Sequence, residues 1–203
     1  MFKRVRIWAD TTSDAIEPRP RRGKRKGHMT LLEYFNTPET VLPQELIYGV
    51  TRVADAPFVS HQRVVLKFAM ALHEYAERAG GEALVAPTDV VLDSARALVV
   101  QPDVVFVSRD RLDLVADRVY GAPDVVVEVL SPRPRIGALE ERVNWFAEYG
   151  VREIWLYNQV DKRLDLLQCS GGKVMTRARA DGGRIPTRVL PGFDHSLGSM
   201  LGW

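Results

Sequence analysis

The sequence lacks several features on which common classes of protein depend. It contains one cysteine, Cys169, in 203 residues, which excludes an intramolecular disulfide and a cysteine-based zinc site. His28, His73 and His195 lie far apart without ligand spacing, so we expect no histidine-based zinc site. The Gly-Gly pairs do not precede a helix, as a phosphate-binding loop would require. The sequence therefore predicts no small-molecule cofactor.

Long apolar segments are also missing. No apolar run is long enough to span a bilayer, and residues 1–8 are basic without the apolar core of a secretory signal. The chain is 46% hydrophobic and 27% charged, which is typical of a globular protein, and its length suits one domain. We expect a cytoplasmic protein that does not associate with a membrane.

An excess of positive charge is confined to the N-terminal arm. The net charge is +2, yet residues 1–28 carry nine Lys and Arg against three Asp and Glu, which leaves the other 175 residues net negative. We therefore expect a basic arm over residues 1–28 and a folded domain over residues 29–203. The arm could hold nucleic-acid phosphates through Arg21, Arg22, Lys24, Arg25 and Lys26. A solvated tail, or a leader that precedes Met29, explains the same charge equally well.

Hydrophobic periodicity predicts an α/β domain with one sheet flanked by helices. We expect a short helix over residues 29–35 and a hairpin over 45–53 that turns at Gly49. A long helix over residues 61–78, with Ser60 as its N-cap, and an amphipathic helix over 137–149 should cover the sheet. The predicted strands are residues 83–92, 99–107, 124–130, 153–158, 163–169 and 173–179.

Two β-branched runs carry the most informative carboxylates. Asp103 opens the run 103–107, and Glu128 lies within the run 124–130. A carboxylate on a buried strand is costly unless it is paired, and a divalent cation is one such partner. Asp103 and Glu128 are therefore our candidate metal ligands in a phosphodiesterase site, with Asp124 in a structural role. The alternative is that both acids face solvent or pair with arginines.

A series of motifs resembles the Uma-two family of restriction endonucleases, within the PD-(D/E)XK nuclease superfamily. The resemblance covers residues 29 to about 201. The motifs are Met29-Thr-x-x-Glu-Tyr, Glu45-Leu-Ile-x-Gly, Ser60-His-Gln, Gln101-Pro-Asp-x-x-Phe-Val-Ser, Gly121-Ala-Pro-Asp-x-Val-Val-Glu-Val-Leu-Ser-Pro, Tyr149-Gly-Val-Arg-Glu-Ile-Trp and Leu190-Pro-Gly-Phe. The resemblance implies a restriction-endonuclease-like fold with a central mixed β-sheet flanked by helices. It also implies Mg²⁺- or Mn²⁺-dependent cleavage of DNA, and a homodimer.

The same resemblance extends the candidate site. It implies that the carbonyl of Val129 is a metal ligand and that Glu45 adds a carboxylate to the metal shell. The motif lysine is replaced by Leu130, and the family's migrated lysine corresponds to Arg142, with Ala138 where an acid is usual. Arginine can bind a phosphate oxygen and neutralise its charge, but it does not release its proton near neutral pH. We therefore expect Arg142 to position or neutralise the phosphate.

Two other functions remain open. The chain could be a catalytically weakened or inactive nuclease-fold protein that binds DNA, which Arg142 and Ala138 favour. It could instead be a protein-interaction module that uses the edge strands at residues 163–179. His61 is a weak candidate for contact with a phosphate, since a histidine at the start of a helix is more often a simple polar first-turn residue.

Overall fold

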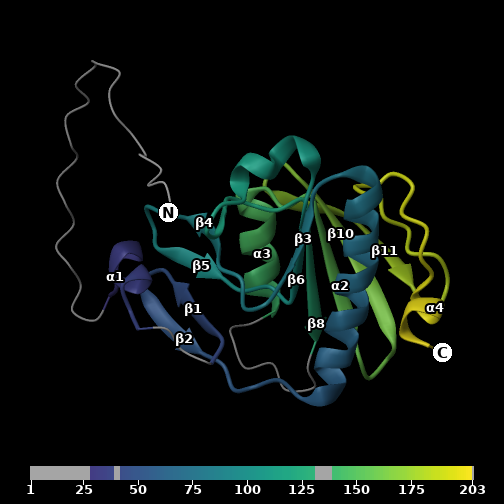
Figure 1. The fold of residues 1–203 in the computed structure, drawn as a ribbon, viewed down its shortest axis with the longest axis horizontal. Coiled ribbons are helices and arrows are strands. Elements are labelled where there is room, and N and C mark those ends of the chain that lie inside the picture. Colours follow the sequence, from purple (N-terminus) through teal and green to yellow (C-terminus); the bar gives the residue numbers. More distant parts are fainter. Residues whose placement is uncertain (1–27, 39–41, 131–138, 203) are drawn as a thin grey trace, which may run out of the picture.

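The computed structural model describes residues 28–38, 42–130 and 139–202 (Figure 1). The predicted basic arm, with Arg21, Arg22, Lys24, Arg25 and Lys26, lies outside the described residues, as does Ala138. Within the described part of the chain, no helix is long and apolar enough to cross a membrane.

The largest element is a mixed six-stranded sheet with the strand order β11-β10-β9-β8-β6-β3. Its central strands, β8 and β9, are parallel, and the other pairs are antiparallel. The strands are β3 (Glu82–Val85), β6 (Val104–Val107), β8 (Val125–Leu130), β9 (Glu153–Asn158), β10 (Arg163–Ser170) and β11 (Lys173–Ala180).

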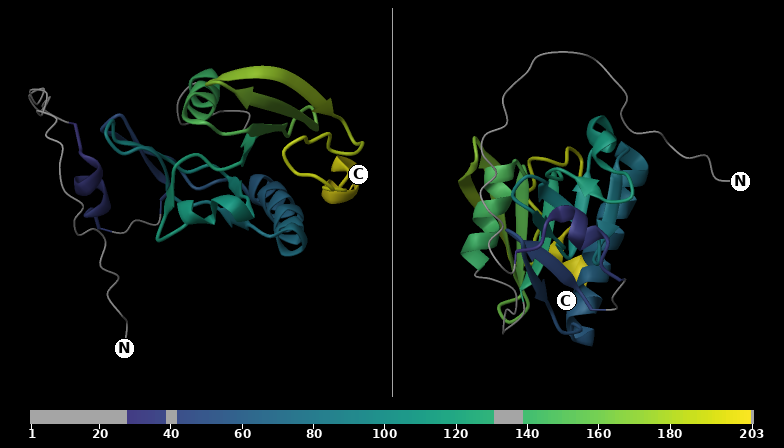
Figure 2. Two further views of the ribbon diagram at one scale, coloured as in Figure 1. Left: turned by 90° about the horizontal axis from the view of Figure 1, so that it is seen from above. Right: turned by 90° about the vertical axis from the view of Figure 1, so that its left-hand side faces the viewer.

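A second, five-stranded sheet has the order β2-β1-β5-β4-β7, in which only β4 and β7 are parallel. Its strands are β1 (Gln44–Ile47), β2 (Val50–Val53), β4 (Val90–Asp93), β5 (Leu98–Val100) and β7 (Val119–Tyr120). The short helix α1 (Leu31–Phe35) lies on this sheet, far from the C-terminal helix α4 (Leu197–Leu201) (Figures 1 and 2). A 3₁₀ helix, η1 (Arg109–Leu114), follows β6.

Two helices cover opposite faces of the six-stranded sheet. Helix α2 (Val59–Ala79) packs Phe68 and Leu72 against Trp155 in one core cluster. Helix α3 (Leu139–Tyr149) packs Phe146 against Ile154 in a second cluster, to which β4 and β5 also contribute side chains. Helix α3 is therefore held between the two sheets, where its side chains can reach both.

The α/β class, with a mixed sheet flanked by helices, is confirmed. The predicted long strands were wrong in one respect, because residues 83–92 and 99–107 each divide between the two sheets. Pro87 and Pro102 lie at the divisions, and proline cannot donate a hydrogen bond to a strand neighbour. The predicted N-cap was also wrong: α2 begins at Val59 after Phe58, without a side-chain cap.

Candidate active site

Four predicted site residues converge from both sheets and from α3. Glu45 lies on β1, Asp103 directly precedes β6, Glu128 lies on β8, and Arg142 is one turn into α3. The antiparallel register pairs Val104 with Val127, and its continuation places Asp103 opposite Glu128 on the same face of the sheet. This face is the one that α3 covers. The fold thus brings together residues that are widely separated in the sequence.

Arg142 joins the two glutamates. Its Nη1 donates to both carboxylate oxygens of Glu45 at 2.8 Å, and its Nη2 and Nε donate to Oε1 of Glu128 at 2.6 and 3.1 Å. The Arg142 side chain is 8% exposed, Glu45 is 1% exposed and Glu128 is 14% exposed. All three guanidinium nitrogens are therefore engaged by carboxylates in a nearly dry environment.

Two groups other than Arg142 hold the carboxylate of Asp103. Its Oδ2 accepts a hydrogen bond from the main-chain N–H of Val129 at 2.7 Å and lies 3.3 Å from Nε2 of His61. His61 is buried in the first turn of α2, and its Nδ1 has no hydrogen-bond partner among the described residues. The side chain therefore faces the carboxylate cluster, an arrangement that sequence periodicity did not predict.

Among the described residues, three carboxylates and two basic side chains make up this cluster. Glu45 and Glu128 bind Arg142, whereas Asp103 lies beside His61. Burial raises the pKa of Glu128 to about 7, opposed by Arg142 and reinforced by the charges of Asp103 and Glu45. Burial tends to lower the pKa of Arg142, yet the two glutamates raise it, so this guanidinium stays charged.

His61 responds to two of the same carboxylates. Burial lowers its pKa, but the hydrogen bond and charge of Asp103, the main chain of Val129 and the charge of Glu128 together raise the pKa above its usual value. The protonated imidazole is consequently favoured by its surroundings.

The donor atoms suit a hard divalent cation. No hydrogen bond within the described part of the chain reaches Oδ1 of Asp103 or Oε2 of Glu128, and neither atom is among the buried unsatisfied atoms there. Neither oxygen is therefore bound to a donor among the described residues, and carboxylate oxygens are preferred ligands of Mg²⁺. No group of three His, Cys, Asp or Glu side chains in the described ranges could hold a metal ion by itself. A cation here would need a main-chain oxygen and water as additional ligands.

Asp124 lies outside the cluster, despite its place in the same motif. Its fully buried carboxylate accepts hydrogen bonds from the Ser108 N–H at 2.7 Å and from Arg111 at 3.0 Å. Arg152 lies 2.8 Å from the same carboxylate. These contacts tie the start of β8 to η1 and to the start of β9. They agree with the structural role that strand spacing suggested.

Comparison with known proteins adds a family to this geometry. The Uma2 family model, described as "Putative restriction endonuclease", matches residues 30–198. The chain belongs to the Uma2 family. A solved structure described as "a putative nuclease belonging to DUF820 from Anabaena variabilis ATCC 29413" superposes with a TM-score of 0.73 at 16% identity, over 86% of this chain and 98% of that one. At this identity the match establishes the fold alone. No curated protein matches the sequence.

Proposed function

We propose that this Uma2 protein is a metal-dependent endodeoxyribonuclease that hydrolyses phosphodiester bonds at the Glu45–Asp103–Glu128–Arg142 cluster. The observation that carries the proposal is the convergence of Glu45, Asp103 and Glu128 from two sheets, with two of these carboxylates bound to the buried Arg142. Two of these carboxylates share one guanidinium, and no described residue donates a hydrogen bond to Oδ1 of Asp103 or Oε2 of Glu128. Membership of a family described as restriction endonucleases supports the same chemistry.

Mg²⁺ or Mn²⁺ fits these donors. Oδ1 of Asp103, Oε2 of Glu128 and the carbonyl of Val129 would hold the ion, and Glu45 would support the shell through Arg142. The bound ion would supply an activated water and would polarise the scissile phosphate. The Val129 N–H and His61 hold Oδ2 of Asp103, which leaves its other oxygen directed away from these partners.

Arg142 has a different first task from the one that its sequence position suggests. Because its nitrogens already donate to Glu45 and Glu128, it sets the separation and orientation of the two carboxylates. Contact with a DNA phosphate would require it to release one glutamate. The phosphate contact remains a prediction. Arg142 cannot serve as the general base, because its surroundings stabilise the charged form.

The test is nicking of supercoiled plasmid in Mg²⁺ and in Mn²⁺. Wild type should nick, and Asp103→Asn and Glu128→Gln should each lose about 100-fold or more of the rate, since outer-shell changes alone cost up to this amount. Asp165→Asn is the matched control, because this carboxylate pairs with Arg163 and Arg179 on the distant strands β10 and β11. Equal nicking by the two site variants and wild type would overturn the assignment.

A second candidate is a catalytically weakened nuclease-fold protein that acts by binding DNA. The full engagement of Arg142 by the two glutamates favours it, because among the described residues the cluster has no lysine and its one guanidinium is occupied. Arg142→Lys separates the two candidates. If wild type binds DNA without nicking while Arg142→Lys cuts, the binding function holds.

We also propose that the protein acts on DNA as a homodimer, because cutting both strands of a duplex is simplest with two sites. Light scattering coupled to size-exclusion chromatography tests this state. A mass equal to a single chain, unchanged when duplex DNA is added, would contradict it.

A further inference from the structure

Gln101 lies beside the site, where the chain passes from one sheet to the other. It lies between β5 of the five-stranded sheet and β6 of the six-stranded sheet, two residues before Asp103. Its main-chain N–H donates to Oε1 of Glu45 at 2.7 Å. The main chain of Gln101 thus holds the carboxylate of Glu45. Its position two residues before Asp103 also ties it to a second site carboxylate.

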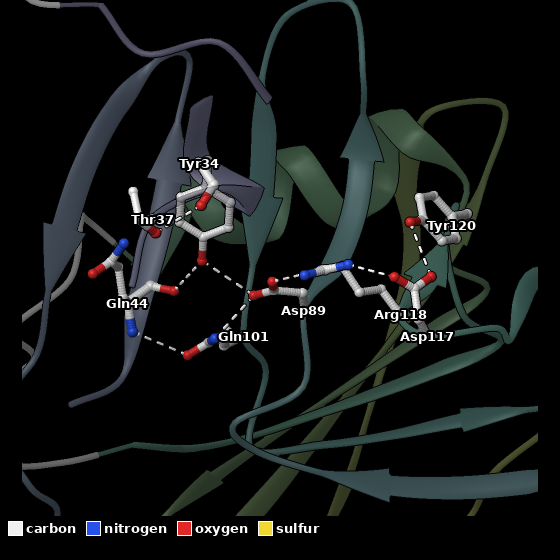
Figure 3. A network of polar contacts seen from close by, with 8 residues as sticks. All are labelled: Tyr34, Thr37, Gln44, Asp89, Gln101, Asp117, Arg118 and Tyr120. Atoms are coloured by element: carbon white, nitrogen blue, oxygen red, sulfur yellow. Dashed lines mark hydrogen bonds and ion pairs between the residues drawn. The ribbon is translucent and has the colours of Figure 1, made fainter. Parts of the chain in front are cut away.

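The side chain of Gln101 is fixed at both of its polar atoms. Its Oε1 accepts from the N–H of Gln44 at 3.1 Å, and its Nε2 donates to Oδ1 of Asp89 at 2.9 Å (Figure 3). Gln44 is the residue next to Glu45. The amide therefore connects the strand that carries Glu45 to the chain that carries Asp103.

Asp89 is held in turn by residues that lie away from the site. Its Oδ1 also lies 3.2 Å from the Tyr34 hydroxyl, which is 2.8 Å from the carbonyl oxygen of Gln44, and its Oδ2 accepts from Nε of Arg118 at 3.2 Å (Figure 3). Burial and the charge of Asp89 raise the pKa of Tyr34, so the phenol remains a hydrogen-bond donor. Asp89 is thereby committed to accepting bonds, and it dictates which way the Gln101 amide faces.

We propose that Gln101 is a positioning residue, oriented by Asp89, that sets Glu45 relative to Asp103 and so fixes the Glu45–Arg142–Glu128 contacts. The inference rests on the proposed function for its catalytic meaning, but the positioning itself is independent of cleavage. A residue that only closed a turn would need no partner at both ends of its amide and would not contact a site carboxylate.

Three variants separate positioning from simple structural support. Gln101→Leu removes both side-chain hydrogen bonds at similar volume. Gln101→Glu keeps the acceptor for Gln44 but sets a second carboxylate against Asp89. The double variant Gln101→Glu with Asp89→Asn exchanges donor and acceptor and restores the bond. Gln168→Leu is the control. The side chain of Gln168, on β10, accepts a hydrogen bond from Thr176 on β11, and this bond does not involve the site.

Two measurements on these variants test the positioning role, and neither requires DNA. The first is the NMR resonance of the Arg142 Nε–H, which donates to Glu128. The second is Mn²⁺ affinity, measured by electron paramagnetic resonance. Gln101→Leu and Gln101→Glu should shift the resonance and weaken Mn²⁺ binding about 10-fold, the double variant should recover both, and Gln168→Leu should change neither.

The outcomes distinguish this proposal from the proposed function. An unchanged Arg142 resonance in folded Gln101→Leu would overturn the positioning role, even if the protein cleaves DNA. If wild type binds no Mn²⁺, the metal-dependent function fails, and the Arg142 resonance still decides whether Gln101 positions the cluster. Failure of the double variant to recover the resonance would show that Asp89 does not orient the amide.

Discussion

Replacing Arg142 with methionine should destabilise the protein strongly. The substitution keeps an unbranched side chain of similar reach but removes the positive charge between Glu45, 1% exposed, and Glu128, 14% exposed. Removing one partner from a buried ion pair costs roughly 3–5 kcal/mol, because the other charge stays buried without compensation. For a domain of this size we expect the melting temperature at pH 7.5 to fall by about 10 °C.

The loss in Arg142→Met should depend on pH. Without the guanidinium, the pKa of Glu128 rises further in the folded state, whereas its pKa in the unfolded chain does not change. The folded protein then binds more protons than the unfolded chain, so its stability increases as the pH falls. The deficit should therefore shrink as the pH falls from about 9 to about 7, and it should change little below pH 7, where wild type gains the same stability from Glu128.

Urea and thermal unfolding followed by circular dichroism, with EDTA present, would measure both effects. The double variant Arg142→Met with Glu45→Gln should recover part of the lost stability, since it removes one orphaned charge. Arg179→Met is the matched control, because its partner Asp165 is 25% exposed and such pairs contribute about 1 kcal/mol or less. A loss below about 1 kcal/mol at pH 7.5, or a loss independent of pH, would refute the reasoning.

Three further predictions concern stability. Burial, opposed by Arg142, holds the pKa of Glu128 at about 7, against an ordinary value of 4.5. The free energy of unfolding of wild type should therefore fall by up to about 3 kcal/mol as the pH rises over this interval. Urea titrations should show no such slope in Glu128→Gln. Asp124→Asn removes the charge that faces two arginines and should cost about 3 kcal/mol of unfolding free energy. Gly49→Ala should lower the melting temperature by several degrees, because φ is +85° and a Cβ would lie 3.0 Å from a main-chain oxygen.

The sequence predicted the elements around Asp103 and Glu128 because their β-branched runs are local signals. It also predicted the strands near residues 153–179 and the helix that carries Arg142, since their periodicity reports a covered face. The division of residues 99–107 was not predicted, because apolar residues continue on both sides of Pro102. The sheet to which each half belongs is decided by pairing with β1 and β8, which are distant in the chain.

The site was predicted as a set of residue types rather than as an arrangement. Arg142 and Glu45 are 97 residues apart, and nothing in local sequence indicates that they meet. The contact of His61 with Asp103 was missed for the same reason. The role of Gln101 was also missed, although Pro102 offered a signal: a proline that interrupts a strand leaves neighbouring main-chain groups free to bind side chains.

The most direct test of the central claim is the Mn²⁺ concentration dependence of plasmid nicking, measured for wild type and Glu128→Gln under identical conditions. Our account predicts no nicking in EDTA, saturable nicking by wild type, and a much weaker response from Glu128→Gln that requires more Mn²⁺. Nicking in EDTA, or identical Mn²⁺ dependence in the two proteins, would show that this carboxylate cluster is not the metal-dependent hydrolytic site.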